Sequence, residues 1–261
     1  QVLAIQRRLG PSAENNLVAT LVNYATLLAE SGDIQSALAL EQEAYEEHKR
    51  RLGNDHPLTL LIRNNMGVSL LDLDRAQDAL TALGEAAEGR ARVQGAQHPL
   101  TLRSLASKAR ALDGVGRSEE ALALYDQVIE ARKRILGKSH RDTLRVSISR
   151  NALLARLGHP AQAVADARQT YADAVAGLGE NSGEAIDALL SLAGLEARAG
   201  QGDAARARLA ARLASLEAEA GEELPSSAYA VALDLFMQLR EAGLHDQAGA
   251  VRERLFAPLL G

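Results

Sequence analysis

Apolar side chains occupy one face of a series of predicted helices along this chain. In the first of them Leu21, Ala25 and Leu28 stand three or four positions apart. This spacing puts side chains on one face of an α-helix and leaves the other face polar. The same pattern predicts first helices over residues 14–30, 57–72, 99–114, 141–156, 183–198 and 226–241, and second helices over residues 34–51, 76–93, 118–135, 160–177, 203–219 and 245–257.

Two series of turn residues separate these helices at a fixed period. The outer series is Gly10, Gly53, Gly95, Gly137, Gly179 and Gly221, at intervals of 42 or 43 residues. The inner series is Gly32, Asp74, Gly116, Gly158, Gly200 and Gly243. A constant period with two helices in each unit is typical of an α-solenoid, in which each unit packs only on its neighbours. We therefore predict an all-α fold of about six helix-turn-helix repeats.

Composition narrows the class of protein without naming a partner. Of the 261 residues, 47% are hydrophobic and 24% are charged, as in ordinary soluble proteins, and no apolar run is long enough to insert into a membrane. The net charge of −5 argues against nucleic acid as a partner. Cysteine is absent from the sequence, which excludes disulfides and thiolate chemistry.

The sequence begins with Gln1, and residues 1–10 (QVLAIQRRLG) are similar to the ends of later second helices, such as AYEEHKRRLG. We expect residues 1–10 to be the end of a preceding repeat helix, so that the chain is a piece of a longer protein. We expect a cytoplasmic location, or a periplasmic one if a membrane anchor precedes the sequence in that longer protein.

The motifs LGNDHPLT (residues 52–59), GAQHPLT (residues 95–101) and LGKSHRDT (residues 136–143), with the pair Asn64-Asn65, resemble tetratricopeptide repeats of the 42-residue, kinesin-light-chain-like type. The resemblance implies one right-handed α-solenoid over residues 11–261, with repeats at about 11–53, 54–95, 96–137, 138–179, 180–221 and 222–261. It also implies a non-enzymatic scaffold whose first helices line a concave groove that takes extended or helical peptide segments.

If that orientation holds, the residues 13, 9, 6 and 2 positions before each inner turn form the groove wall. Their charges sum to −1, −1, +2, +2, 0 and −2 over the six repeats. A basic patch would steer an acidic segment of a partner into the groove. The alternative is that these arginines are solvated charges whose apolar stems rest on neighbouring residues. The arginines concerned are Arg103, Arg110, Arg145, Arg156 and Arg198.

One column of this wall is small and polar in every repeat, with asparagine, serine or aspartate nine positions before the turn. The resemblance implies that asparagines here hold the backbone of a bound peptide, since a carboxamide both donates and accepts hydrogen bonds. Alternatively, a short polar side chain is simply tolerated at a tight helix crossing. The candidate peptide-binding residues from this reasoning are Asn23, Asn64, Asn65, Ser107 and Ser149.

Three packing positions carry charges instead of apolar side chains, namely Lys108, Arg150 and Glu196. Lys108 and Arg150 indicate either function or a poorly packed junction. Glu196 stands where the first four repeats have leucine, so we expect the fifth repeat to be the loosest joint of the array.

No catalytic, metal or cofactor site is predicted. His56, His98 and His140 are one repeat apart, about 10 Å by ordinary helix packing, which is too far for a shared metal. We interpret them as linker residues near helix starts. No motif for nucleotide binding or nucleophilic catalysis stands out.

Three functional hypotheses follow. The first is a scaffold or sensor module that binds a peptide segment of a partner protein, acidic at its centre. The second is the regulatory part of a larger signalling protein, such as a bacterial serine/threonine kinase. The third is an architectural module that associates with itself.

Overall fold

The described part of the chain, residues 14–220, 226–242 and 244–255, consists of α-helices joined by short turns. The predicted ranges match the observed helices to within two residues at each end, so the predicted all-α fold is confirmed. The predicted helix end at residues 1–10 lies outside the described residues. In this computed structural model the first helices are α2 (Glu14–Glu30), α4 (Pro57–Asp72), α6 (Pro99–Gly114), α8 (Arg141–Arg156), α10 (Gly183–Arg198) and α12 (Ser226–Glu241), and the second helices are α3 (Ile34–Leu52), α5 (Ala76–Gln94), α7 (Ser118–Leu136), α9 (Pro160–Leu178), α11 (Gly202–Ala220) and α13 (His245–Leu255).

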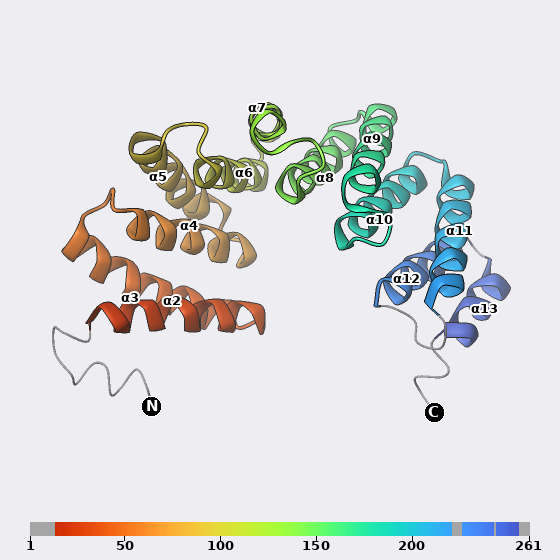
Figure 1. The fold of residues 1–261 in the computed structure, drawn as a ribbon, viewed down its shortest axis with the longest axis horizontal. Coiled ribbons are helices and arrows are strands. Elements are labelled where there is room, and N and C mark those ends of the chain that lie inside the picture. Colours follow the sequence, from red (N-terminus) through yellow and green to blue (C-terminus); the bar gives the residue numbers. More distant parts are fainter. Residues whose placement is uncertain (1–13, 221–225, 243, 256–261) are drawn as a thin grey trace. The chain divides into compact units, whose positions relative to one another are not determined.

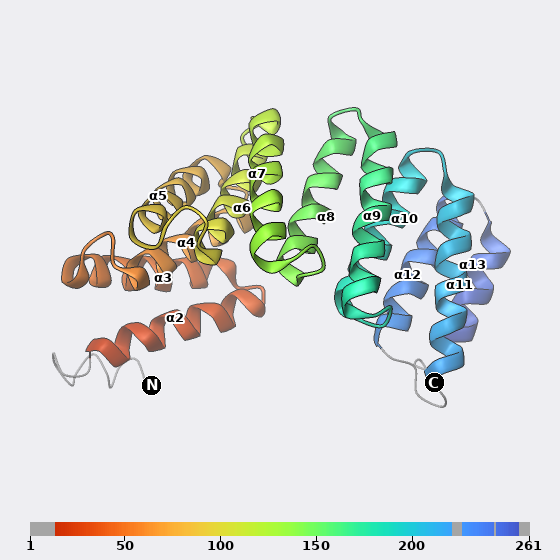
Figure 2. The ribbon, with the colours of Figure 1, turned by 45° about the horizontal axis from the view of Figure 1, so that its top comes forward.

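The chain forms two compact units, Gln1–Ala131 and Arg132–Gly261, and consecutive helices pack on each other from α2 to α6 and from α8 to α13. In the first unit α2, α3, α4, α5 and α6 form consecutive hairpins (Figure 1). In the second unit α8 to α13 do the same, and Figure 2 shows α9, α10 and α11 side by side. First helices also contact each other across repeats, α4 with α6, α8 with α10, and α10 with α12. The extent of a single array over residues 11–261 stays a prediction.

The inner turns close each first helix with a left-handed residue. In the first repeat Gly32 has a φ of 89°, its N–H donates to the Ala29 carbonyl, and the N–H of Asp33 donates to the Leu28 carbonyl. These two bonds satisfy carbonyls that the helix end would otherwise leave free. In the second repeat Asp74 takes this place at a φ of 58°, a left-handed conformation that aspartate tolerates. The same pair of bonds recurs at Gly116, Gly158 and Gly200.

The outer turns are more demanding, which explains why their residue is always glycine in the described chain. Gly53 has a φ of 83° and a ψ of 171°. Gly95 and Gly179 combine φ values of 97° and 85° with ψ values of 153° and 156°. A Cβ atom is excluded from this region of backbone space, so only glycine adopts it readily. The outer series therefore cannot admit a substitution like Asp74.

Histidines cap three of the first helices. Nδ1 of His98 accepts a hydrogen bond from the N–H of Leu100 at 3.2 Å, and the His98 backbone is extended. Such an acceptor satisfies one of the N–H groups that a helix leaves free at its start. His56 and His140 make the same contact, and Ser182 caps α10 with its hydroxyl group. The interpretation of these histidines as residues near helix starts is confirmed.

Small residues let the helices approach closely. Gly67 faces Leu83 so tightly that a Cβ on the glycine would lie 2.5 Å from the leucine Cγ. A larger residue there would force the two helices apart. One alanine in each second helix is likewise buried, namely Ala37, Ala79, Ala121, Ala163, Ala205 and Ala248.

The charged packing residue of the fifth repeat is integrated into the core of the second unit. The Glu196 side chain is fully buried. Arg168 of α9 donates to its Oε1 at 2.8 Å, and Arg208 of α11 donates to the same oxygen at 3.1 Å. Glu196 thus links three helices through ion pairs where a leucine would link them by packing. That this repeat is the loosest joint stays a prediction.

A second buried carboxyl group, that of Glu41 on α3, has no ionic partner in the described residues. The side chain is buried, and its Oε2 has no hydrogen-bond partner. Burial raises the pKa of Glu41 from 4.5 to about 7, and a hydrogen bond with Ser69 only partly offsets this. The folded chain therefore holds the Glu41 proton to a higher pH than the unfolded chain does.

We predict that the cap of α6 depends on the acceptor atom of His98. His98→Ala should lower the free energy of unfolding by about 1 kcal/mol, because an N–H at the helix start loses its acceptor. His98→Ser should retain most of the stability, since serine caps α10 in the same way. Urea denaturation followed by circular dichroism measures both variants. An equal loss in the two would show that the imidazole contributes by packing and not as an acceptor.

We also predict a pH-dependent stability that originates at Glu41. Because its pKa is raised in the folded state, the free energy of unfolding should fall as the pH rises from about 4.5 to about 7 and then level off. Glu41→Gln should remove this slope and be more stable than the natural chain by about 1–3 kcal/mol at pH 8, with little difference at pH 4. Denaturation curves across this range test it, with the exposed Glu46→Gln as control. Parallel pH profiles for the natural chain and Glu41→Gln would contradict it.

Candidate functional site

The face of the first helices turned away from the core is the candidate binding surface. We call it the first-helix face and define it as the residues 13, 9, 6 and 2 positions before each inner turn. None of its members with a described side chain is buried. The opposite side of the same helices carries the buried residues, for example Leu21 and Ala25 in α2. The helical period therefore leaves this face open to a partner.

In the first unit the structure places four of the six candidate residues fully on this surface without an internal ion pair. Asn23 and Arg103 are exposed, and Asn65 and Ser107 are half-buried. Together they offer carboxamide, hydroxyl and guanidinium groups along α2, α4 and α6. These groups can donate and accept hydrogen bonds to a peptide backbone or side chain.

Asn64 does not lie on the first-helix face. It is buried, and its Oδ1 accepts a hydrogen bond from Ser104 Oγ at 2.8 Å. The same Ser104 oxygen accepts a hydrogen bond from Arg90 at 2.7 Å. Neighbouring residues on an α-helix point about 100° apart, so Asn64 and Asn65 cannot share one face. The carboxamide of Asn64 belongs to a core network that connects α4, α5 and α6.

Arg110, the sixth candidate of the first unit, is already paired. Its guanidinium forms an ion pair with Asp72, a member of the same face on α4. The pair removes much of the positive charge that the sequence assigned to the third repeat. Because both side chains are largely exposed, the pair is weak and can exchange for a partner's charge.

Positive charge remains concentrated around Arg103. This arginine forms no hydrogen bond or ion pair with the described residues. Behind it Arg90 is buried and donates hydrogen bonds to two neutral groups, the Leu100 carbonyl and the Ser104 hydroxyl. Burial, followed by repulsion from Arg103, lowers the pKa of Arg90 to about 10. Two guanidinium groups, that of Arg103 on α6 and that of Arg90 on α5, therefore lie at the first half of α6 without a carboxylate paired to them, which favours an anionic ligand at Arg103.

In the second unit the candidate residues Arg145, Ser149, Arg156 and Arg198 are all exposed. Arg145 and Arg198 form no ion pair with described residues. The Ser149 hydroxyl donates to the Arg145 carbonyl at 3.2 Å and keeps its acceptor lone pairs. On α12 this face is acidic, because it carries Asp234 and Glu241. Burial raises the pKa of Asp234.

Buried arginines are the residues that sequence reasoning missed. Arg90 and Arg132 occupy the same position in consecutive second helices, and each donates to the carbonyl of the second residue of the next first helix, Leu100 and Asp142. The signal that could have found them is their separation of one repeat. These hydrogen bonds connect α5 to the first turn of α6 and α7 to the first turn of α8, close to the candidate arginines Arg103 and Arg145.

The described residues do not form a metal site. They contain no group of three or more histidine, aspartate or glutamate side chains placed to hold a metal ion. Nor does any helix in this part of the chain have the length and apolar character needed to cross a membrane.

Comparison with known proteins shows which sequence family part of this chain matches and which solved structures share its fold. The sequence model of the tetratricopeptide repeat matches residues 16–90 and 58–134. A putative kinesin light chain from Podosopora anserina with nearly identical TPR-like repeats is 20% identical, with a TM-score of 0.67 over 79% of this chain and 97% of that one. Residues 16–134 therefore have the sequence pattern of tetratricopeptide repeats, and the described chain has the fold of a tetratricopeptide-repeat α-solenoid. Such arrays are non-catalytic modules for protein–protein interaction.

Other solved structures share the fold at lower identity. BtubC (BKLC) from P. vanneervenii is 18% identical, with a TM-score of 0.68 over 85% of this chain and 90% of that one. NprR in complex with its cognate peptide NprX is 13% identical, with a TM-score of 0.62 over 98% of this chain and 72% of that one. No curated protein matches the sequence at a significant level.

Two serines one turn apart on α6 of the tetratricopeptide array separate core from surface roles. Ser104→Ala should lower the free energy of unfolding by about 1–3 kcal/mol, because it leaves buried groups of Arg90 and Asn64 without a partner. Ser107→Ala, on the first-helix face, should change it by less than about 0.5 kcal/mol. Thermal and urea denaturation of the two variants measure the difference. Equal stabilities would contradict the buried network.

Proposed function

We propose that this array is a scaffold or sensor module that binds a peptide segment of a partner protein along the first-helix face, with a preference for acidic segments. The observation that carries the proposal is the exposed Arg103, which has no ionic partner and lies beside the half-buried Ser107. An arginine in this setting offers several donors to a carboxylate in a fixed geometry.

The polar groups around Arg103 support binding of a peptide backbone. Asn65 on α4 and Ser107 on α6 occupy the same position of consecutive repeats, and α4 contacts α6. A ladder of short polar side chains can pair with the alternating N–H and carbonyl groups of an extended segment. The structurally similar NprR is in complex with its cognate peptide NprX, which supports peptide binding by this fold.

Charge then sets the preference among peptides. In the first unit Arg110 is paired with Asp72, so Arg103 provides the main free positive charge of this face. In the second unit Arg145 and Arg198 provide it. We expect electrostatics to act chiefly on the association rate and on specificity, and to weaken as salt screens it. A regulatory role within a larger signalling protein and self-association remain the alternative hypotheses.

We predict that charge reversal at the first-helix face impairs partner capture. The double variant Arg103→Glu/Arg145→Glu should capture about tenfold less of an acidic partner than the natural chain, a loss of about 1.4 kcal/mol. The measurement is quantitative affinity capture from a lysate of the source cells, repeated at low and high salt. Binding of the captured partner's segment is then measured by calorimetry.

Arg75→Glu is the matched control, because Arg75 is an exposed arginine at the start of α5 that lies outside the first-helix face. Circular dichroism should show the same helix content for all three proteins. If the double variant and the natural chain captured the same proteins in the same amounts and with the same salt dependence, the first-helix face would not be the binding surface.

A further inference from the structure

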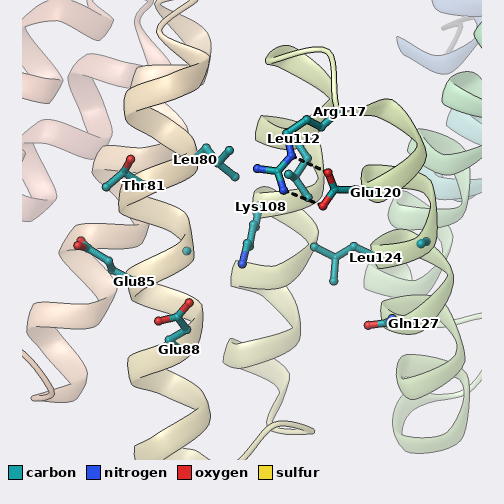
Figure 3. A pocket seen from close by; sticks show the side chains of 12 residues that line it. Leu80, Thr81, Glu85, Glu88, Lys108, Leu112, Arg117, Glu120, Leu124 and Gln127 are labelled. Carbon is teal, nitrogen blue, oxygen red and sulfur yellow. Dashed lines mark hydrogen bonds and ion pairs between the residues drawn. The ribbon is translucent and has the colours of Figure 1, made fainter.

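A hollow lies on the other side of α6 from the first-helix face. It has a volume of about 560 Å³ and opens between α5 and α7, with α6 as its floor (Figure 3). Leu80, Leu112 and Leu124 line its apolar end. Lys108 extends from the floor at its polar end, where Glu88 lies on the α5 side. The Arg117–Glu120 ion pair lies beside Leu112, so the hollow combines apolar side chains with charges of both signs, and Lys108 is its basic group without an ion pair.

The hollow exists because a packing position carries Lys108. Three other repeats place an apolar side chain there: Met66, which packs against two core clusters, and the buried Leu192 and Leu235. Opposite Lys108, Gly84 contributes no side chain, and a Cβ built on it would lie 3.9 Å from the Lys108 Cε. A chain selected only for packing would fill this space, since a void forfeits dispersion contacts.

The Lys108 ammonium group lacks a directly contacting partner. It forms no hydrogen bond or ion pair with the described residues, although the side chain is half-buried. In the next repeat Arg150 holds the equivalent position and is paired with Asp166. The residue equivalent to Asp166 in this repeat is Leu124. In the fourth repeat the cation at this position is therefore paired with a carboxylate, whereas in the third repeat Leu124 stands where that carboxylate would be.

Nearby carboxylates are engaged elsewhere or stand at the rim. Glu120 receives two hydrogen bonds from Arg117, at 2.6 and 2.7 Å. Glu85 is paired with Arg63 on α4. Glu120 feels the positive charge of Lys108, but neither carboxylate forms a hydrogen bond or ion pair with it, and the acidic rim repels a polyanion. A ligand with a single carboxylate beside an apolar group fits these charges.

We propose that this hollow is a second binding site, which takes a partner-protein segment with one carboxylate three or four residues from a large apolar side chain. The carboxylate pairs with Lys108 as Asp166 pairs with Arg150, and the apolar side chain contacts Leu80, Leu112 and Leu124. The spacing follows from α6 itself. Lys108 and Leu112 are four residues apart, about 6 Å along the helix, and a ligand helix laid against them has the same rise.

Two variants separate this site from the first-helix face. Lys108→Met supplies the side chain that fills the equivalent space in the second repeat, so it removes the charge and closes the hollow. Leu124→Asp supplies Lys108 with an internal carboxylate at the position of Asp166. Both variants should keep the helix content, and either one suffices if the other fails to fold.

The experiment is a selection of displayed 12-residue peptides on the full chain, with soluble Lys108→Met protein added to remove clones that bind elsewhere. We expect surviving clones with an acidic residue three or four positions from an apolar one. A synthetic peptide from such a clone should bind about tenfold more weakly to Lys108→Met and to Leu124→Asp, and equally well to Arg103→Glu. Changing its acidic residue to the amide should cost the same factor.

Methyl NMR of the leucines locates the site. The selected peptide should shift the Leu80, Leu112 and Leu124 methyl signals of the natural chain. The proposal is overturned if no clone survives the subtraction, if survivors lack an acidic residue, or if the leucine signals do not move. It is also overturned if succinate alone, or dilution of the chain alone, shifts these signals equally, since the occupant would then be a small molecule or a second copy.

Discussion

The structure depends on two backbone turns that recur at a fixed distance. The outer turn requires a conformation open only to glycine, as at Gly53, and the inner turn requires a left-handed residue, which Asp74 can supply. Between them each helix has nearly constant length, so equivalent side chains return to equivalent surroundings in every repeat. Thr101 reinforces the outer turn by donating to the Gly95 carbonyl at 2.9 Å. Packing, capping and the first-helix face all follow from this period.

Once the period is fixed, a repeat can vary only in what it places at a given position. The three charged residues at packing positions differ in how their charge is neutralised. Glu196 is fully buried and is neutralised by two arginines, Arg150 is paired with Asp166, and Lys108 forms no ion pair with the described residues. A buried or half-buried charge is costly without a counter-charge. Lys108, whose charge is not paired, is therefore the informative residue, and it lines a hollow.

Helix α6 presents different chemistry on its two sides. Toward the first-helix face it carries Arg103 and Ser107, and toward the second helices it carries Lys108 and Leu112. The two sides can bind independently, because a helix separates them and no charged contact links them in the described residues. An array of this kind could hold two segments of one partner, in which case linkage would raise the effective affinity without new contacts.

The sequence by itself determined the period, the helices and the residues that face outward, because glycine spacing and hydrophobic periodicity are local properties of the chain. Local pattern could not determine which polar residues find partners. Asn64 was grouped with Asn65 but is buried with Ser104, and Arg110 was counted as free charge but is paired with Asp72. Both contacts join residues about 40 positions apart, from neighbouring repeats. Only tertiary packing brings such residues together, so only the structure decided which charges remain available to a partner.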